Sequence, residues 1–278
     1  MPRRATWWQW PTVLSIDAPV VAVLWQLLLA RVAAVDLGWA PPVVLALSVW
    51  LAYAADRWIE GWRLEADVIR TPRHQFYQHY RWPVAAVWMM ALVADIAIAF
   101  TRLDARDITA GVLVIAAVAM YLLSHQLVHR DRAWRAPKEL CVAALLAAGA
   151  VVFVTRTPQP GALMMPLALF ALLCFTNCAL ISVWERDVDR AHGQTSLALG
   201  ESNHERLIRQ LPLMIAVLAA AASMLGQGAA RDAATAAAAS AILLALVDRI
   251  ERRAGRQPAR VLADIALMTP AIALFFRR

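Results

Sequence analysis

Long apolar stretches constrain this chain more than any other feature of its sequence. Of its 278 residues, 61% are hydrophobic, and its mean hydropathy is +0.56. Only 17% are charged, against roughly 25% in soluble domains. Several of the apolar runs reach the length of about 17–25 residues that a helix needs to cross a bilayer. The sequence therefore predicts an integral membrane protein.

The runs predict an all-α, polytopic bundle of about nine transmembrane helices around a central cavity, in a single domain over residues 1–278. A turn-forming Ala-Pro-Pro stretch precedes the second span. The expected spans are 13–35, 41–55, 83–101, 107–128, 137–155, 162–184, 210–227, 233–250 and 259–276.

Basic residues predict the orientation of these spans. The net charge is +7, and 26 of the 27 basic residues are arginine. By the positive-inside rule, the segments rich in arginine face the cytoplasm. The N-terminus is then cytoplasmic and the C-terminus non-cytoplasmic, and we expect the cell's inner (plasma) membrane as the location. Arginines between apolar runs fit anionic headgroups or phosphates and not a nucleic-acid-binding face. The cytoplasmic segments, which hold 20 of the 27 basic residues, are the N-terminal tail, 57–82, 129–138, 185–209 and 249–260.

Two of the cytoplasmic connections carry pairs of carboxylates. Asp56 and Glu60 follow the second span, and Glu185 and Asp189 follow the sixth. Residues four apart on a helix share a face, so each pair points one way, whereas Asp187 lies about half a turn away. The four-span offset between the two turns predicts two pseudo-equivalent halves around one cavity. Because Mg²⁺ binds through one or two carboxylates together with substrate phosphates, the facing pairs could hold Mg²⁺ on a diphosphate.

Other polar side chains are expected at the same cytoplasmic depth. Asp17 lies early in the first span, and intramembrane carboxylates are functional candidates by default. Asn177 comes two turns before Glu185, where it could line the cavity or hydrogen-bond a neighbouring helix. For Asp95 and Asp264 we expect a buried hydrogen bond to a neighbouring helix, or a protonated carboxyl group. The basic residues that could bind phosphate oxygens are Arg57, Arg63, Arg70, Arg73, Lys138 and Arg190.

This layout resembles the UbiA family of intramembrane prenyltransferases, whose acidic motifs also follow the second and sixth spans. The family motifs are N-D-x-x-D-x-x-x-D and D-x-x-x-D-x-x-x-D. Asp56 and Glu60 occupy the last two acidic positions of the first motif, and Glu185 and Asp189 occupy the last two of the second. Further matches are the Arg-Thr after the first motif, at Arg70-Thr71, and the D-x-x-x-G-x-x-[ST] segment, at Asp189, Gly193 and Ser196.

The chain departs from the family motifs at three positions. Ala52 and Tyr53 stand in place of the Asn-Asp pair of the first motif, and Ile181 replaces the first Asp of the second. Two expected acidic ligands are therefore missing, and the resemblance implies a divergent member.

The resemblance implies that the protein transfers an isoprenoid group from a prenyl diphosphate to a lipophilic acceptor in the membrane. It implies Mg²⁺ as the cofactor that stabilises the leaving diphosphate, and apolar and aromatic walls that shield an allylic cation from water. The residues that it implies are Asp56, Glu60, Glu185 and Asp189 as metal ligands, Arg70, Lys138 and Arg190 on phosphate oxygens, and Asn177 and Asp17 beside the substrate.

Three alternatives stay open at this stage. A terpene cyclase on the same scaffold would use the same diphosphate site without an acceptor. The histidine spacing in HQLVH, at His125 and His129, could instead ligate iron or zinc together with His74 and His79. Histidines facing headgroups are the simpler interpretation of that pattern. The third alternative is a non-catalytic isoprenoid-binding or assembly protein, with the acidic turns as solvated loops.

Overall fold

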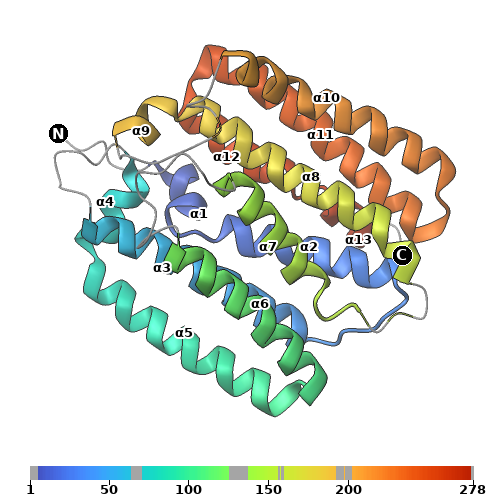
Figure 1. Cartoon of the computed structure of the whole chain (residues 1–278), viewed down its shortest axis with the longest axis horizontal. Helices are drawn as coiled ribbons and strands as arrows, with labels where there is room; N and C mark the ends of the chain where they lie inside the picture. The colour runs from blue at the N-terminus through green and yellow to red at the C-terminus, as the bar shows by residue number, and fades with distance from the viewer. Residues whose placement is uncertain are drawn as a thin grey trace.

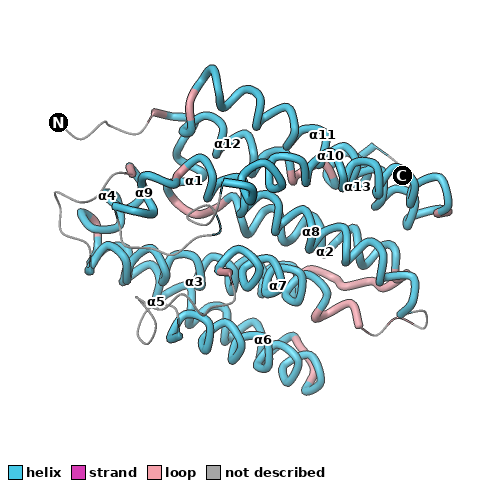
Figure 2. The backbone as a smooth tube through the Cα atoms, turned by 45° about the horizontal axis from the view of Figure 1, so that its top comes forward, coloured by secondary structure: helices cyan, strands magenta, loops and turns pink. Residues whose placement is uncertain are grey.

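The computed structural model shows a bundle of helices, with no strand among the residues it describes (Figures 1 and 2). It describes residues 6–63, 71–124, 137–155, 157, 160–191, 197 and 202–276, and the side chains of all of these except Arg63, Asp189, Ala191, Ser202 and Asn203. In chain order the elements are η1 (Trp7–Gln9), α1 (Trp10–Val13), α2 (Asp17–Val32), α3 (Ala40–Arg63), α4 (Pro72–His79), α5 (Arg81–Arg102), α6 (Ala105–Leu123), α7 (Lys138–Val151), α8 (Pro160–Trp184), α9 (Arg186–Ala191), α10 (Ser202–Leu225), α11 (Gly228–Ala254), α12 (Arg256–Ala266) and α13 (Pro270–Phe276).

Each of the nine expected spans coincides with a helix or a pair of helices. Six described helices are long and apolar enough to cross a membrane: α3, α5, α6, α8, α10 and α11. Two bent pairs, η1–α1 with α2 and α12 with α13, raise the count to eight if each pair is one span. The expected span 137–155 is represented by α7, whose 14 residues extend only about 21 Å at 1.5 Å per residue. The protein is an integral membrane protein.

Successive long helices alternate in direction (Figure 1). The start of the described chain at α1 and its end at α13 therefore lie at opposite ends of the bundle. Helices α4 and α9, the last turns of α3 and α8, and the beginning of α12 lie at the same end as α1, on the left in Figure 1. The two acidic turns are thus brought to one end of the bundle, as their four-span offset predicts.

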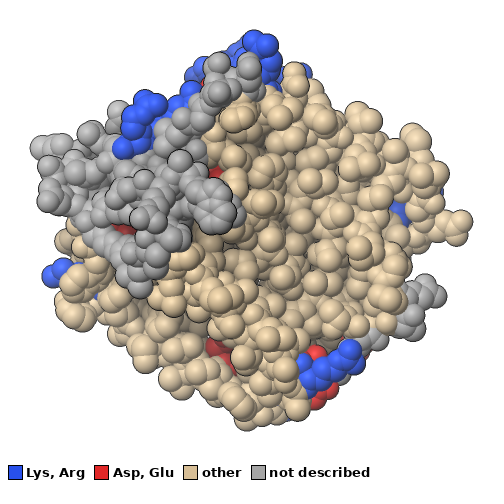
Figure 3. All heavy atoms as spheres, in the orientation of Figure 1, with Lys and Arg blue, Asp and Glu red and all other residues tan. Residues whose placement is uncertain are grey.

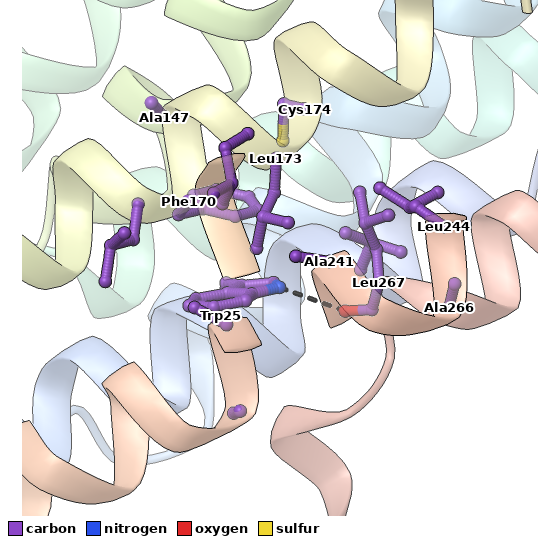
Figure 4. Packing of buried hydrophobic residues seen from close by; sticks show 14 of the residues in the cluster. Trp25, Ala147, Phe170, Leu173, Cys174, Ala241, Leu244, Ala266 and Leu267 are labelled. Carbon is purple, nitrogen blue, oxygen red and sulfur yellow. Dashed lines mark hydrogen bonds between the residues drawn. The ribbon is translucent and has the colours of Figure 1, made fainter. Parts of the chain in front are cut away.

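Helices α2 and α8 form the centre of the bundle around Trp25 (Figure 4). The Trp25 indole has no exposed surface and stacks on Phe170 of α8, with ring centroids 4.8 Å apart. Its Nε1 donates a hydrogen bond of 3.0 Å to the carbonyl oxygen of Leu267, which lies in the break between α12 and α13. Trp25 therefore connects the first, sixth and last expected spans.

Small residues occupy the inner face of α11. Helix α11 packs against α10, α8, α2 and α12. In lipid, helix association depends on close van der Waals packing, and small side chains let backbones approach one another. The buried small residues on this helix include Ala233, Ala234, Ala236, Ala237, Ser240 and Ala241.

Helices α5 and α6 lie at the periphery. Only 11% of the most apolar stretch of α5 and none of that of α6 is buried, whereas 61% of that of α8 is. Their exposed side chains include Met90, Phe100 and Leu113, which are 63%, 70% and 67% exposed. Figure 3 shows few charged side chains across the middle of the visible face and most of them near its margins. This distribution is that of a surface in contact with lipid.

Candidate functional site

A cavity of about 180 Å³ opens at the end of the bundle where the two acidic turns meet. Side chains from α1, α2, α3, α4, α6, α7, α8 and α12 contribute to its wall. Six of the nine site residues expected from the sequence line it: Asp17, Asp56, Glu60, Lys138, Asn177 and Glu185.

The other three expected site residues are not seen at the cavity. Arg70 lies outside the described residues, and Asp189 lies in α9, but its side chain is not among those described. Arg190 is exposed and does not line the cavity. Its proposed contact with phosphate therefore has no support from the geometry.

The acidic residues of the first motif lie on one face of α3, as their i, i+4 spacing predicts. Tyr53, Asp56 and Glu60 all line the cavity from α3, so the positions that match the motif share one face. On α8, Ile181 and Glu185 do the same. Of the three positions at which this chain departs from the family pattern, Tyr53 and Ile181 line the cavity and Ala52 does not.

Glu60 is held by a buried hydrogen-bond chain. His74 of α4 is 1% exposed; its Nε2 lies 2.5 Å from Glu60 Oε2, and its Nδ1 lies 2.5 Å from Thr71 Oγ1. Burial lowers the pKa of His74 to about 4, despite the hydrogen bond to Glu60 that raises it. The ring is then neutral at pH 7. Because a carboxylate only accepts, Nε2–H donates to Glu60 and Nδ1 accepts from the Thr71 hydroxyl.

Glu185 is bound by two arginines. Its Oε2 accepts a hydrogen bond from Arg73 of α4 at 3.2 Å and another from Arg260 of α12 at 2.6 Å. The three side chains are only 10% to 15% exposed. The second acidic turn is thereby tied to the helix that follows the first turn and to the last span.

Asp187 points away from the cavity, as its position half a turn from Glu185 predicts. Its side chain is 71% exposed and pairs with Arg256 at 2.5 Å. Partial burial would raise the pKa of Asp187, but the hydrogen bond from Arg256 outweighs it and lowers the pKa below the usual value. Asp187 is therefore a surface ion pair and offers a matched control for its cavity-facing neighbour.

A second polar cluster lies on the other side of the cavity. Asn177 Nδ2 donates to Asp264 Oδ1 at 3.0 Å, and Asp17 lies next to them in the cavity wall. A sharp break precedes Asp17: Ser15 has a left-handed φ of 57°, and the helices on either side meet at 71°. The predicted buried hydrogen bond of Asp264 to a neighbouring helix is confirmed, as is that of Asp95, which accepts from Ser48 at 2.8 Å.

The cavity wall contains more carboxylates than cations. Its acidic residues are Asp17, Asp56, Glu60, Glu139, Glu185 and Asp264, and its basic residues are Arg57, Arg73, Lys138 and Arg260. An anion with several charges would need an added cation to bind beside this excess of carboxylates. Apolar side chains, among them Val21, Leu146 and Leu267, form the remainder of the wall.

A magnesium ion fits this donor set only together with a substrate. Among the described residues, no three His, Cys, Asp or Glu side chains gather closely enough to hold a metal ion by themselves. Mg²⁺ usually binds through one or two carboxylates and completes its shell with water and phosphate oxygens. Asp56 and Glu60 offer such a pair, and His74 orients Glu60 as outer-shell partners of metal ligands do. Glu185 differs from this pair, because two guanidinium groups contact its Oε2.

Sequence reasoning left several features of the site unrecognised. It treated His74 as an interface or metal-binding residue, not as the partner of Glu60. Arg260, Glu139 and Tyr121 received no role, although all three line the cavity. Arg260 follows Arg256 by one helical turn in a basic stretch that served only to predict orientation. No local signal distinguishes the arginine that binds Glu185 from the one that pairs with the exposed Asp187.

Protein-family models and curated protein sequences give no match to this chain. Among solved structures, the apo structure of a UbiA homolog from Aeropyrum pernix K1 is similar, with a TM-score of 0.61 and 16% sequence identity. The match covers 94% of this chain and 98% of that chain. The two proteins share a fold over almost their whole length, so the resemblance that rests on two acidic turns is confirmed at the level of the fold.

Proposed function

We propose that the protein is a prenyltransferase of the UbiA type, which transfers an isoprenoid group from a prenyl diphosphate to a lipophilic acceptor within the membrane. The observation that carries this proposal is the meeting of Asp56, Glu60 and Glu185 in one cavity at the end of an apolar bundle. A charged end suits a diphosphate, and the apolar remainder suits an isoprenoid chain.

The diphosphate end of the substrate is proposed to lie between α3 and α7. Asp56 and Glu60 would hold Mg²⁺, which would neutralise charge on the leaving diphosphate. Lys138 and Arg57 line the same wall and would bind phosphate oxygens. Arg70 and Asp189 remain proposed contacts from the family resemblance alone.

The acceptor is proposed to lie near Asp17, Asn177 and Asp264. Transfer breaks the carbon–oxygen bond to the diphosphate, forms a bond from the acceptor to the allylic carbon, and releases a proton from the acceptor. A carboxylate in contact with the acceptor can take that proton. Asp17 is the carboxylate proposed for this role, with Asp264, which accepts a hydrogen bond from the Asn177 amide, beside it in the cavity wall.

The cavity is proposed to open toward the cytoplasm, in the inner (plasma) membrane. This orientation rests on the arginine-rich segments that flank the same end of the bundle. Soluble prenyl diphosphates would then enter from the cytoplasm, and lipophilic acceptors would enter from the bilayer.

A terpene cyclase is the second candidate, because the same cavity would serve an intramolecular reaction. Tyr53 supports it: an aromatic ring at the position of a motif carboxylate can stabilise a cation, as the quadrupole of its face allows. The His-carboxylate metalloenzyme has less support, since His79 is exposed and His125 and His129 lie outside the described residues. The double change of His125 and His129 to Ala should leave bound transition metal and activity within about a few-fold of the parent.

Product analysis separates these functions. The purified protein would be incubated with Mg²⁺, a radiolabelled prenyl diphosphate and a lipid extract of the source membrane. Prenylated lipid together with released pyrophosphate supports transfer. A labelled hydrocarbon or alcohol formed without the extract indicates a cyclase. Binding without pyrophosphate release leaves a non-catalytic isoprenoid-binding protein.

A further inference from the structure

The second acidic turn has a different charge environment from the first. Glu60 Oε2 lies 2.5 Å from His74 Nε2 and is also near the charges of Arg57 and Arg73, whereas Glu185 accepts hydrogen bonds from two guanidinium groups on a single oxygen. A divalent cation bound to Glu185 would lie within a few ångströms of two positive charges. It would either displace an arginine or bind against their repulsion.

The neighbouring motif position also disfavours a metal. Ile181, one helical turn before Glu185, turns an apolar side chain to the cavity where the family motif has a carboxylate. On α3 the equivalent position is Tyr53, which is not a carboxylate either, and the last two motif positions are Asp56 and Glu60 there against Glu185 and Asp189 in the second turn. The two halves therefore differ in what meets their carboxylates: His74 at Glu60 and two guanidinium groups at Glu185.

The arginines themselves are arranged as an anion-binding pair. Arg73 and Arg260 come from α4 and α12, and Glu185 holds both guanidinium groups at the cavity wall. Arg260 has a buried Nε without a hydrogen-bond partner among the described residues, and so does Arg57 of α3, which also lines the main cavity. Guanidinium groups match phosphate oxygens in bidentate geometry, so a bound phosphate would satisfy these donors.

Arg73 and Arg260 also line a second cavity. Arg73, Glu185 and Arg260 line a smaller cavity of about 50 Å³ in addition to the main one. Gln9, Thr12 and Gln257 belong to the wall of this smaller cavity. The arginine pair thus contributes to the walls of both cavities.

We propose that Glu185 is not a metal ligand but a positioning residue that holds Arg73 and Arg260 as an arginine pair, which binds the diphosphate directly. The carboxylate pair Asp56 and Glu60 provides the metal-dependent half of the site. A bound diphosphate therefore takes one Mg²⁺ instead of the two that paired acidic motifs would hold. This inference rests on the proposed function and specifies how its substrate is recognised.

The test measures Mg²⁺ dependence and ligand affinity separately. The full-length protein in detergent is titrated with inorganic pyrophosphate and with a non-hydrolysable prenyl thiolodiphosphate at a series of Mg²⁺ concentrations. Asp56→Asn should raise the Mg²⁺ concentration for half-maximal binding by about tenfold or more. Glu185→Gln should leave that concentration within about twofold of the parent but weaken binding at saturating Mg²⁺ by about fivefold or more.

Two further variants guard against misfolding. Glu185→Gln leaves two buried arginines without their carboxylate, so Arg260→Lys, which keeps the charge but loses the planar fork, provides an independent reading. It should weaken ligand binding by about fivefold at an unchanged Mg²⁺ midpoint. Asp187→Asn removes the same charge from the same turn on its exposed side, and it should change neither quantity by more than about twofold.

The outcome also depends on metal stoichiometry. Electron paramagnetic resonance with Mn²⁺ in place of Mg²⁺ should show one bound ion per bound pyrophosphate. Two ions, or a Mg²⁺ midpoint that rises in Glu185→Gln as much as in Asp56→Asn, would overturn the inference and return Glu185 to the metal ligands. Binding of pyrophosphate without binding of the prenyl analogue would refute the proposed function while still deciding the role of Glu185. A parent protein that binds neither ligand would refute both.

Discussion

The hydrogen-bond chain Thr71–His74–Glu60 predicts that acid destabilises the protein through one histidine. In the folded protein the pKa of His74 is lowered to about 4 by burial, against an ordinary value of 6.5. Between pH 4 and pH 6.5, His74 is protonated in the unfolded chain but neutral in the folded protein. Stability is therefore complete above about pH 6.5 and is lost as the pH falls toward 4.

The magnitude follows from the linkage relation. The free energy of unfolding should fall by about 1.4 kcal/mol for each pH unit in this window, or by about 3 kcal/mol over its whole width. This is a large effect for one side chain, and it arises because His74 is 1% exposed, and burial disfavours its charged form.

The assay is reversible unfolding in mixed micelles between pH 7 and pH 5, with EDTA present so that no divalent ion contributes. His74→Gln retains an amide that can donate to Glu60 and does not titrate, so its stability should depend much less on pH. His79→Gln changes an exposed histidine of the same helix and should keep the slope of the parent. A slope in His74→Gln equal to that of the parent would show that His74 is not buried as a neutral ring.

Two other predictions concern the bundle. Trp25→Phe keeps an aromatic ring against Phe170 but leaves the buried Leu267 carbonyl oxygen without its hydrogen-bond donor. The free energy of unfolding should fall by about 1–3 kcal/mol in the same assay. A change below about 0.3 kcal/mol would contradict the packing at the centre of the bundle. A reporter fused to the C-terminus should be non-cytoplasmic, and a reporter inserted in 185–209 should be cytoplasmic. A cytoplasmic C-terminus would mean that one of the nine expected spans does not cross the membrane; α7 is the shortest of them.

The helices could be predicted because hydropathy and length are local properties. All nine apolar segments coincide with helical elements, including 259–276, which reads as one span. Its break before Pro270 follows from a residue that cannot donate a backbone hydrogen bond. The shortness of α7 also departs from expectation, since the residues that follow Val151 turn away from helical geometry although they are as apolar as a span.

The orientation of the carboxylates could be predicted for the same reason. The i, i+4 spacing of Asp56 and Glu60 places both in the cavity wall, and the half-turn offset of Asp187 places it outside. The partners of these carboxylates could not be predicted. Whether Glu185 meets a metal or two arginines depends on which helix ends lie beside α8, and Arg260 reaches it from the last span. Such contacts depend on tertiary packing, which the periodicity of apolar residues in the sequence does not predict.

Equilibrium binding of a prenyl diphosphate analogue tests the central claim most directly, namely that the cavity between the acidic turns is a diphosphate site. The parent protein should bind the analogue saturably in Mg²⁺ and lose it in EDTA. Asp56→Asn should weaken binding at least tenfold at a fixed, subsaturating Mg²⁺ concentration, equivalent to about 1.4 kcal/mol or more, whereas Asp187→Asn should stay within about twofold because its ion pair with Arg256 is exposed. Equal effects of the two substitutions, or binding that ignores Mg²⁺, would contradict the account.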